Sequence, residues 1–108
     1  MSAKAAVRLE AARQDERQAV IYYAREAGLE VALGFRQALR EAYRAIADHP
    51  GTGSPRYAEL VGIRGLRGRS LNRFPFLVFY IDREDHIEVW RVLHAQRDIP
   101  ATLVEPTG

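Results

Sequence analysis

Hydrophobic residues run together and then alternate in the C-terminal half of the chain. Residues 74–81 read FPFLVFYI, an apolar and aromatic run that is too short for an ordinary helix. Such a run predicts a strand buried on both faces. After a polar break, residues 87–94 alternate, which places Ile87, Val89 and Leu93 on one face. Two strands joined by a short polar turn predict a β-hairpin.

The second strand of this hairpin has a charge among its apolar positions. Arg91 falls on the same face as Leu93. A guanidinium among apolar side chains is costly unless it reaches water or has a partner. We therefore expect Arg91 to lie at an edge or to pair with another group. The other face of the strand holds Glu88, Trp90, Val92 and His94.

The N-terminal half begins with a strand pattern and continues with a helix pattern. Residues 5–9 predict a short strand with Val7 and Leu9 on one face. From residue 11, apolar residues recur at helical spacing, and Gly28 is expected to end that helix in a left-handed conformation. The apolar stripe consists of Ala12, Ala19, Val20, Tyr23, Ala24 and Ala27. Tyr22 lies off this stripe, so we expect it to contact a partner.

A second helix follows at once, with apolar residues spaced three or four apart. Its stripe consists of Leu29, Ala32, Phe35, Leu39, Ala42 and Ile46. Pro50 is expected to end it, because proline cannot continue the hydrogen-bond ladder and restricts the residue before it. Since little more than Gly28 separates the two helices, they must fold back as an antiparallel hairpin.

The remaining segments are rich in glycine and proline. Residues 50–55 read PGTGSP and predict a connection without regular structure. Residues 66–71 predict a third strand, with the nearby glycines allowing a bend or bulge. The segment after Asp98 is expected to be irregular, and residues 101–108 to form a loose tail.

These elements define a two-layer α+β fold of β-α-α-β-β-β order, with a helical hairpin packed on one face of a small antiparallel sheet. A chain of 108 residues is expected to form a single domain over residues 1–108. The other face of the sheet is expected to be partly solvated or bound to a partner, with the arginine-rich strand on that side.

Composition narrows the possible chemistry. The sequence has no cysteine, and the separated His49, His86 and His94 do not form a metal-ligand pattern. We expect no metal and no cofactor, since phosphate-loop, nucleophile-elbow and zinc motifs are also missing. No apolar run is long enough to cross a membrane, and residues 1–12 lack a signal-peptide pattern. A cytoplasmic location is expected.

Positive charge gathers in one stretch. Residues 60–81 contain four arginines and no carboxylate: Arg64, Arg67, Arg69 and Arg73. Such a cluster indicates an anionic partner, because it repels itself otherwise, although a solvated strand is the alternative. His94 has two interpretations, a general acid or base, or a strand-end histidine bonded to the backbone. Arg97 and Asp98 are expected to form a local clasp after the last strand.

Several motifs together resemble the ParE branch of the RelE/ParE toxin superfamily, over about Val7 to Pro100. They are FPFLVFYID, HIEVWRVLHAQRDIP, the helix pattern Ala32-x-x-Phe35-x-x-x-Leu39, and then Ile46, Pro50 and Gly53. The most specific part is the RVLH motif at residues 91–94, followed by Arg97 and Asp98.

The resemblance implies the toxin of a bacterial type II toxin–antitoxin pair that inhibits DNA gyrase. It also implies a ParD-like antitoxin whose flexible segment folds on binding, in a hetero-oligomer that is a heterotetramer or larger. Operator DNA would be bound only through the antitoxin. On this interpretation the protein is expected to act by binding its target and not as an enzyme.

Two alternatives stay open. A RelE-like toxin would be a ribosome-dependent mRNA endonuclease, for which the candidate catalytic residues are Arg67, Arg69, Arg91 and His94. Against it, residues 101–108 contain neither tyrosine nor histidine, and the lysines common in such sites are missing. The other alternative is an inactive homologue that acts only in operon repression.

The candidate binding residues follow from these interpretations. The target-binding candidates are Arg64, Arg67, Arg69, Arg73, Arg91 and Arg97. The antitoxin is expected to contact Tyr22, the apolar surface of the helical hairpin and an edge of the sheet, where open backbone groups can be satisfied.

Overall fold

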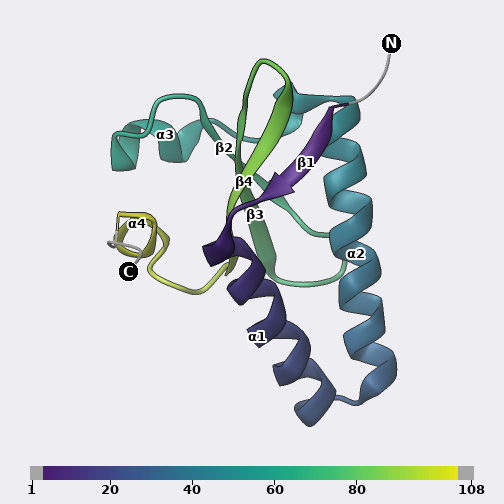
Figure 1. Cartoon of the computed structure of the whole chain (residues 1–108). Helices are drawn as coiled ribbons and strands as arrows, with labels where there is room; N and C mark the ends of the chain where they lie inside the picture. The colour runs from purple at the N-terminus through teal and green to yellow at the C-terminus, as the bar shows by residue number, and fades with distance from the viewer. Residues whose placement is uncertain (1–3, 105–108) are drawn as a thin grey trace.

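The computed structural model describes residues 4–104, and Figure 1 shows how the elements are arranged. The elements are β1 (Ala5–Arg8), α1 (Glu10–Glu26), α2 (Leu29–Asp48), a 3-10 turn (Pro50–Thr52), α3 (Arg56–Val61), β2 (Leu66–Ser70), β3 (Phe76–Asp82), β4 (His86–His94) and α4 (Ile99–Leu103). The predicted α+β fold is confirmed, together with its order of one strand, two long helices and three strands.

Four strands form one mixed sheet in the order β1-β4-β3-β2. The last three are consecutive antiparallel neighbours, as predicted. β1 adds to the open edge of β4 in parallel, with Ala5 opposite His86 and Arg8 opposite Val89. β1 therefore covers only the first half of β4, and the second half lies beside α1.

The helical hairpin covers one face of the sheet (Figure 1). Gly28 joins its two helices with φ +100°, a value that L side chains rarely adopt. Phe35 and Ile46 of α2 are fully buried against Val78 and Val89 of the sheet. The two predicted helices and their turn are thus confirmed, and α2 ends before Pro50 as expected. No helix among residues 4–104 is long and apolar enough to cross a membrane.

A β-bulge changes the predicted faces of β4. Phe79 lies opposite Arg91, but the next residue of β3, Tyr80, lies opposite Val89, so Trp90 has no partner across the ladder. One extra residue reverses the alternation from that point onward. Val92 therefore packs toward the helical hairpin, whereas Trp90 and Leu93 pack on the other face. The predicted alternation holds through Trp90 and was wrong beyond it.

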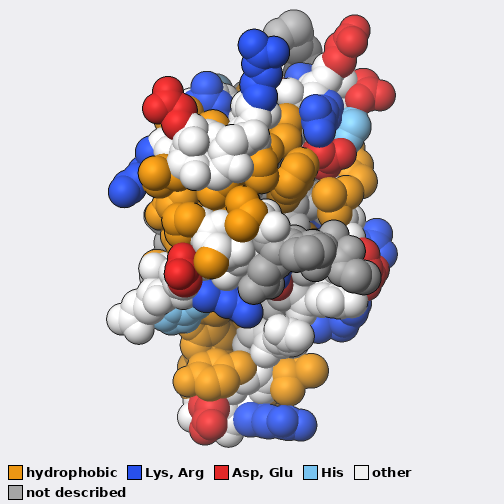
Figure 2. All heavy atoms as spheres, turned by 90° about the vertical axis from the view of Figure 1, so that its left-hand side faces the viewer, with side chains coloured by type: hydrophobic (Ala, Val, Ile, Leu, Met, Phe, Trp, Pro, Cys, Tyr) orange, Lys and Arg blue, Asp and Glu red, His pale blue; other side chains and the backbone are white. Residues whose placement is uncertain are grey.

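The other face of the sheet, which was predicted to be partly solvated or bound to a partner, is covered by helices of the chain itself. α3 and α4 pack there over a second buried cluster that includes Leu66, Phe79, Ile81, Leu93, Ile99 and Leu103. Figure 2 shows this side, where apolar side chains gather. Residues 56–61 form a helix that the sequence analysis did not predict.

Two predicted irregular segments are partly regular. The connection after α2 contains the 3-10 turn, which the sequence analysis did not predict. Residues 101–103 belong to α4 instead of a loose tail, because Ile99 and Leu103 are buried against the sheet and Asp98 caps the helix by accepting from the amide of Ala101 (3.3 Å). The rest of the predicted tail, 105–108, lies outside the described residues.

Candidate functional site

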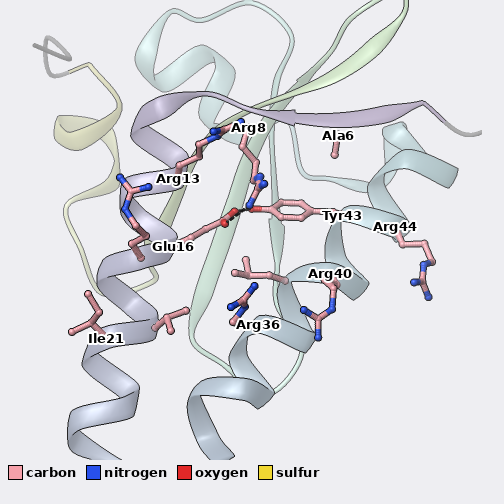
Figure 3. Close-up of a pocket in the computed structure, with 12 residues that line it drawn as sticks. Ala6, Arg8, Arg13, Glu16, Ile21, Arg36, Arg40, Tyr43 and Arg44 are labelled. Atoms are coloured by element: carbon pink, nitrogen blue, oxygen red, sulfur yellow. Dashed lines mark hydrogen bonds and ion pairs between the residues drawn. The ribbon is translucent and has the colours of Figure 1, made fainter. Parts of the chain in front are cut away.

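A basic groove runs between α1 and α2 below β1, with a volume of about 920 Å³ (Figure 3). Six arginines line it: Arg8, Arg13, Arg17, Arg36, Arg40 and Arg44. Ala6, Val20, Ile21, Leu39 and Tyr43 contribute apolar surface, and Glu16 contributes a carboxylate. We call this site the basic groove.

Helical spacing produces the two rows of arginines. Arg13 and Arg17 lie four residues apart on α1, and Arg36, Arg40 and Arg44 repeat the same spacing on α2. Residues four apart share one face of a helix. The antiparallel hairpin sets the two rows on either side of the apolar residues. The groove is therefore apolar between two basic sides.

The single carboxylate of the groove is already engaged. Glu16 accepts a hydrogen bond from Nη1 of Arg8 at 2.9 Å and another from the hydroxyl of Tyr43 (Figure 3). Burial and the nearby Glu16 carboxylate raise the pKa of Tyr43, so that its hydroxyl stays a donor. Arg13, Arg36 and Arg44 form no ion pair within the described part of the chain. The groove consequently presents positive charge to a ligand.

Arg67 and Arg69 fix the turn that follows α2. Arg67 donates to the carbonyl oxygen of Gly53 at 2.7 Å, and Arg69 donates to Oγ1 of Thr52 at 3.0 Å. Arg67 lies opposite Tyr80, whose side chain packs with the helical hairpin. These two arginines therefore point to the hairpin side of the sheet. The expectation that they lie on the opposite face was wrong, because the register of β2 turns their side chains to this side.

Arg91 pairs with another group, which is one of the two outcomes expected from the sequence. Its Nε donates to Oδ2 of Asp15 at 2.7 Å, and its Nη2 donates to Oδ1 at 2.9 Å. The same carboxylate accepts the backbone amide of Val92 at 2.9 Å. Asp15 thus joins α1 to the part of β4 that β1 does not cover. The charge of Arg91 is therefore neutralised by an ion pair within the protein.

His94 lies at the end of β4 with a local set of contacts. Its Nδ1 accepts from the amide of Gln96 at 3.1 Å, and its ring lies edge-on to Phe76 with centroids 5.1 Å apart. The backbone hydrogen bond expected for a histidine at the end of a strand is therefore present.

Arg97 is exposed, and together with His94 it lines a surface hollow between α1 and β4. Within the described residues Arg97 makes no ion pair. The chain after β4 is held locally instead, because the amide of Arg97 donates to the carbonyl oxygen of His94 at 3.0 Å and the carboxylate of Asp98 accepts the amide of Ala101 at 3.3 Å.

The remaining predicted residues are exposed and separated. Arg64 precedes β2, and Arg73 lies in the turn after it with φ +69°. Tyr22 is 59% exposed on α1. The fold does not gather Arg67, Arg69, Arg91 and His94 at one point: the first two lie on edge strand β2, the others on β4, and β3 runs between them. Among residues 4–104, no group of three or more acidic or histidine side chains is placed to hold a metal ion.

The arginines of the basic groove were not among the site residues predicted from the sequence. Their signal was present, since Arg36, Arg40 and Arg44 recur at four-residue spacing. Surface arginines at that spacing are ordinary on a solvated helix. Only the packing of α1 against α2 shows that two such rows face each other.

Residues 7–99 match the family model described as the ParE toxin of the type II toxin–antitoxin system parDE. The chain belongs to the ParE toxin family. It is accordingly a ParE-type toxin of a toxin–antitoxin system, and the resemblance noted in the sequence is confirmed. A comparison with curated proteins finds no match.

A solved structure from P. aeruginosa, titled as a chromosomal ParDE toxin–antitoxin system, has the same fold. Its TM-score to this ParE-family chain is 0.71 at 21% sequence identity, over 86% of this chain and 97% of that chain. At that identity the likeness establishes the fold. The helical hairpin and the sheet of this chain thus have the same arrangement as in that chain.

Proposed function

We propose that this ParE-family toxin acts in the cytoplasm by binding and inhibiting DNA gyrase, and that a ParD-like antitoxin neutralises it. The antitoxin lies along the basic groove in this proposal. Exposed arginines outside the groove, Arg64, Arg73 and Arg97, are the candidates for contact with the target. Operator DNA is bound only through the antitoxin, and the complex is a heterotetramer or larger.

The observation that supports binding over catalysis is the separation of the four residues that RNA cleavage would require. Cleavage needs cations at the scissile phosphate and an acid or base within hydrogen-bond reach of the reacting oxygens. Arg67 and Arg69 hold a turn beside β2, whereas Arg91 is bound to Asp15. His94 lies across β3 from the first two. A toxin that acts by binding needs no such convergence.

The chemistry of the groove supports an acidic, amphipathic antitoxin segment. Its apolar residues, such as Val20 and Leu39, provide area for burial between the arginines of α1 and α2. The two basic rows match a helix whose apolar face carries Asp and Glu at its margins. Such a segment offsets the repulsion among the arginines, which the free toxin retains.

The test of the target is a supercoiling assay with purified gyrase, run beside a ribosome-dependent mRNA cleavage assay. We expect inhibited supercoiling or trapped DNA breaks with intact mRNA, and the same result for His94→Gln. Cleaved mRNA with unaffected gyrase contradicts the proposal and assigns the protein to the RelE-like class. If neither assay responds to the folded toxin, the protein acts only in repression with its antitoxin.

A second experiment separates the two proposed surfaces by charge reversal. Arg36→Glu with Arg40→Glu changes the groove, and Arg64→Glu with Arg73→Glu is the matched pair outside it. We expect the groove pair to raise the dissociation constant of the antitoxin by about 100-fold, since repulsion replaces attraction at two sites, and to leave gyrase inhibition intact. The outside pair should weaken gyrase inhibition alone. Equal weakening of antitoxin binding by both pairs would remove the groove from the proposal.

A further inference from the structure

A second hollow lies between α1 and β4, on the opposite side of α1 from the basic groove, with a volume of about 380 Å³. Four of its lining residues have rings: Tyr22, Tyr23, Phe76 and His94. We call it the ring-lined cleft. We propose that it binds an aromatic side chain flanked by carboxylates, on a part of the antitoxin that continues out of the basic groove. This inference rests on the proposed function, which assigns the antitoxin to that groove.

The rings already pack edge-on, which is the arrangement that an incoming ring would extend. Tyr22 and Tyr23 have centroids 5.5 Å apart at 74° between their planes, and Phe76 and His94 have centroids 5.1 Å apart at 73°. The ring centroids of Tyr23 and Phe76 are 6.1 Å apart, so the two pairs are in contact with each other. Aromatic rings favour such edge-to-face contacts beyond the area they bury. Tyr22 is 59% exposed, which leaves ring surface uncovered for a ligand.

Two hydrogen-bond donors accompany these rings. Nδ1 of His94 accepts the amide of Gln96, so the proton of the neutral ring is on Nε2. Arg97 lines the cleft, and its guanidinium pairs with no carboxylate among residues 4–104. The carboxylate of Asp15, which also lines the cleft, is occupied by Arg91. The cleft thus combines aromatic rings with nearby hydrogen-bond donors. This combination suits a ligand that carries an aromatic ring next to a carboxylate.

The cleft is continuous with the basic groove across the outer surface of α1. A third, shallower hollow of about 290 Å³ connects them. It shares Ile21 with the groove, and it shares Gln18 and Tyr22 with the cleft. One polypeptide can therefore cross α1 while staying in contact with the toxin. Two joined sites bind more tightly than either alone, because the second contact becomes intramolecular.

A peptide suits the cleft better than a nucleotide does. Phosphate groups are held by several charged donors or by a row of backbone amides. Arg97 is the one guanidinium among the residues that line the cleft, and Tyr22, Tyr23 and Phe76 contribute aromatic rings to its walls. A side-chain ring with a neighbouring Asp or Glu needs only one such donor.

The test uses the full-length, ¹⁵N-labelled toxin and capped tripeptides, followed by NMR. The probe is acetyl-Glu-Phe-Glu-amide, and the matched peptides are acetyl-Gln-Phe-Gln-amide, which lacks the charges, and acetyl-Glu-Ala-Glu-amide, which lacks the ring. AMP tests the nucleotide alternative. We expect the probe to shift signals of Gln18, Val92 and Arg97. Removing the ring should weaken binding about tenfold or more, and removing the charges about two- to fivefold.

Two variants complete the design. Arg97→Gln should weaken binding of the charged probe about two- to fivefold, by the same factor as removal of the charges from the peptide. Arg64→Gln changes an exposed arginine outside the cleft and should leave binding of the probe unchanged. Shifts confined to the groove, equal binding of the ring-free peptide, or tighter binding of AMP would each overturn the inference. Because the toxin is measured alone, failure here is distinct from failure of the supercoiling assay that tests the proposed function.

Discussion

The ion pair between Asp15 and Arg91 makes the most direct prediction about stability. The two side chains are only 6% and 14% exposed, and Asp15 accepts three hydrogen bonds, two from Arg91 and one from the amide of Val92. Replacing Asp15→Ala removes the carboxylate to which the largely buried Arg91 guanidinium and the Val92 amide both donate. Removing one partner of a buried pair costs about 3–5 kcal/mol.

We expect the lower end of that range, about 3 kcal/mol, because water reaches part of the Arg91 side chain. For a domain of this size, such a loss lowers the melting temperature by more than about 10 °C. Asp15→Asn keeps a carbonyl oxygen for the Val92 amide but loses the charge, so it should cost less than Asp15→Ala. Replacing Arg91→Met completes a double-mutant cycle, for which we expect a coupling energy of about 2 kcal/mol.

The assay is urea unfolding followed by circular dichroism, with the slope against denaturant checked for constancy. Glu10→Gln is the control, because its ion pair with Arg17 is exposed and should change stability by less than about 0.5 kcal/mol. The reasoning would be refuted if Asp15→Ala changed stability no more than this control does. It would also be refuted by a coupling energy near zero in the cycle.

Three further predictions concern titration and packing. The pKa of Tyr43 is raised by burial and by the adjacent carboxylate, so the folded state keeps a proton that the unfolded chain loses near pH 10. The contribution of Tyr43 to stability is therefore complete below about pH 10 and falls as pH rises, and in urea titrations from pH 8 to 11 the Tyr43→Phe variant should lose less stability than the unchanged protein. Burial alone would raise the pKa of Glu88, but hydrogen bonds from Trp90 and Arg83 lower it overall, so the emission of the single tryptophan should titrate with a midpoint below the ordinary pKa of a glutamate. The contribution of Glu88 to stability is complete above the pKa of the unfolded chain and is lost as pH falls through that of the folded state, and Glu88→Gln should abolish the fluorescence transition. Gly68→Ala would place a Cβ 2.9 Å from a buried ring carbon of β3 and should cost about 1–3 kcal/mol in the same unfolding assay, an expectation contradicted by unchanged stability.

Regular elements were predictable wherever local spacing alone decides them. The 3-4 spacing from Leu29 to Ile46 requires a helix if its apolar stripe is to be buried, and Pro50 ends it for a covalent reason. The apolar run up to Ile81 likewise requires a strand. α3 was missed because residues 56–61 are too few for a helical period to show, and packing of Tyr57 on Phe79 stabilises it instead.

The candidate site was less predictable, because its parts are distant in sequence. Asp15 and Arg91 are 76 residues apart, so the sequence showed only that Arg91 needed either a partner or an exposed edge. The basic groove likewise needs arginines from both helices to face each other. His94 was identified in advance, but its position depends on the bulge at Trp90, which reverses the side-chain alternation before it.

The sequence by itself determined the order of the main elements, the helical hairpin at Gly28 and the family to which the chain belongs, since periodicity, special backbone conformations and short motifs are local properties. The tertiary structure alone decided which charged side chains pair within the protein and which stay open at the surface. The reason is that strand register and helix packing are settled by contacts between distant residues: the bulge at Trp90 sets the faces of β4, and the closure of α1 on α2 turns two solvated rows of arginines into one groove.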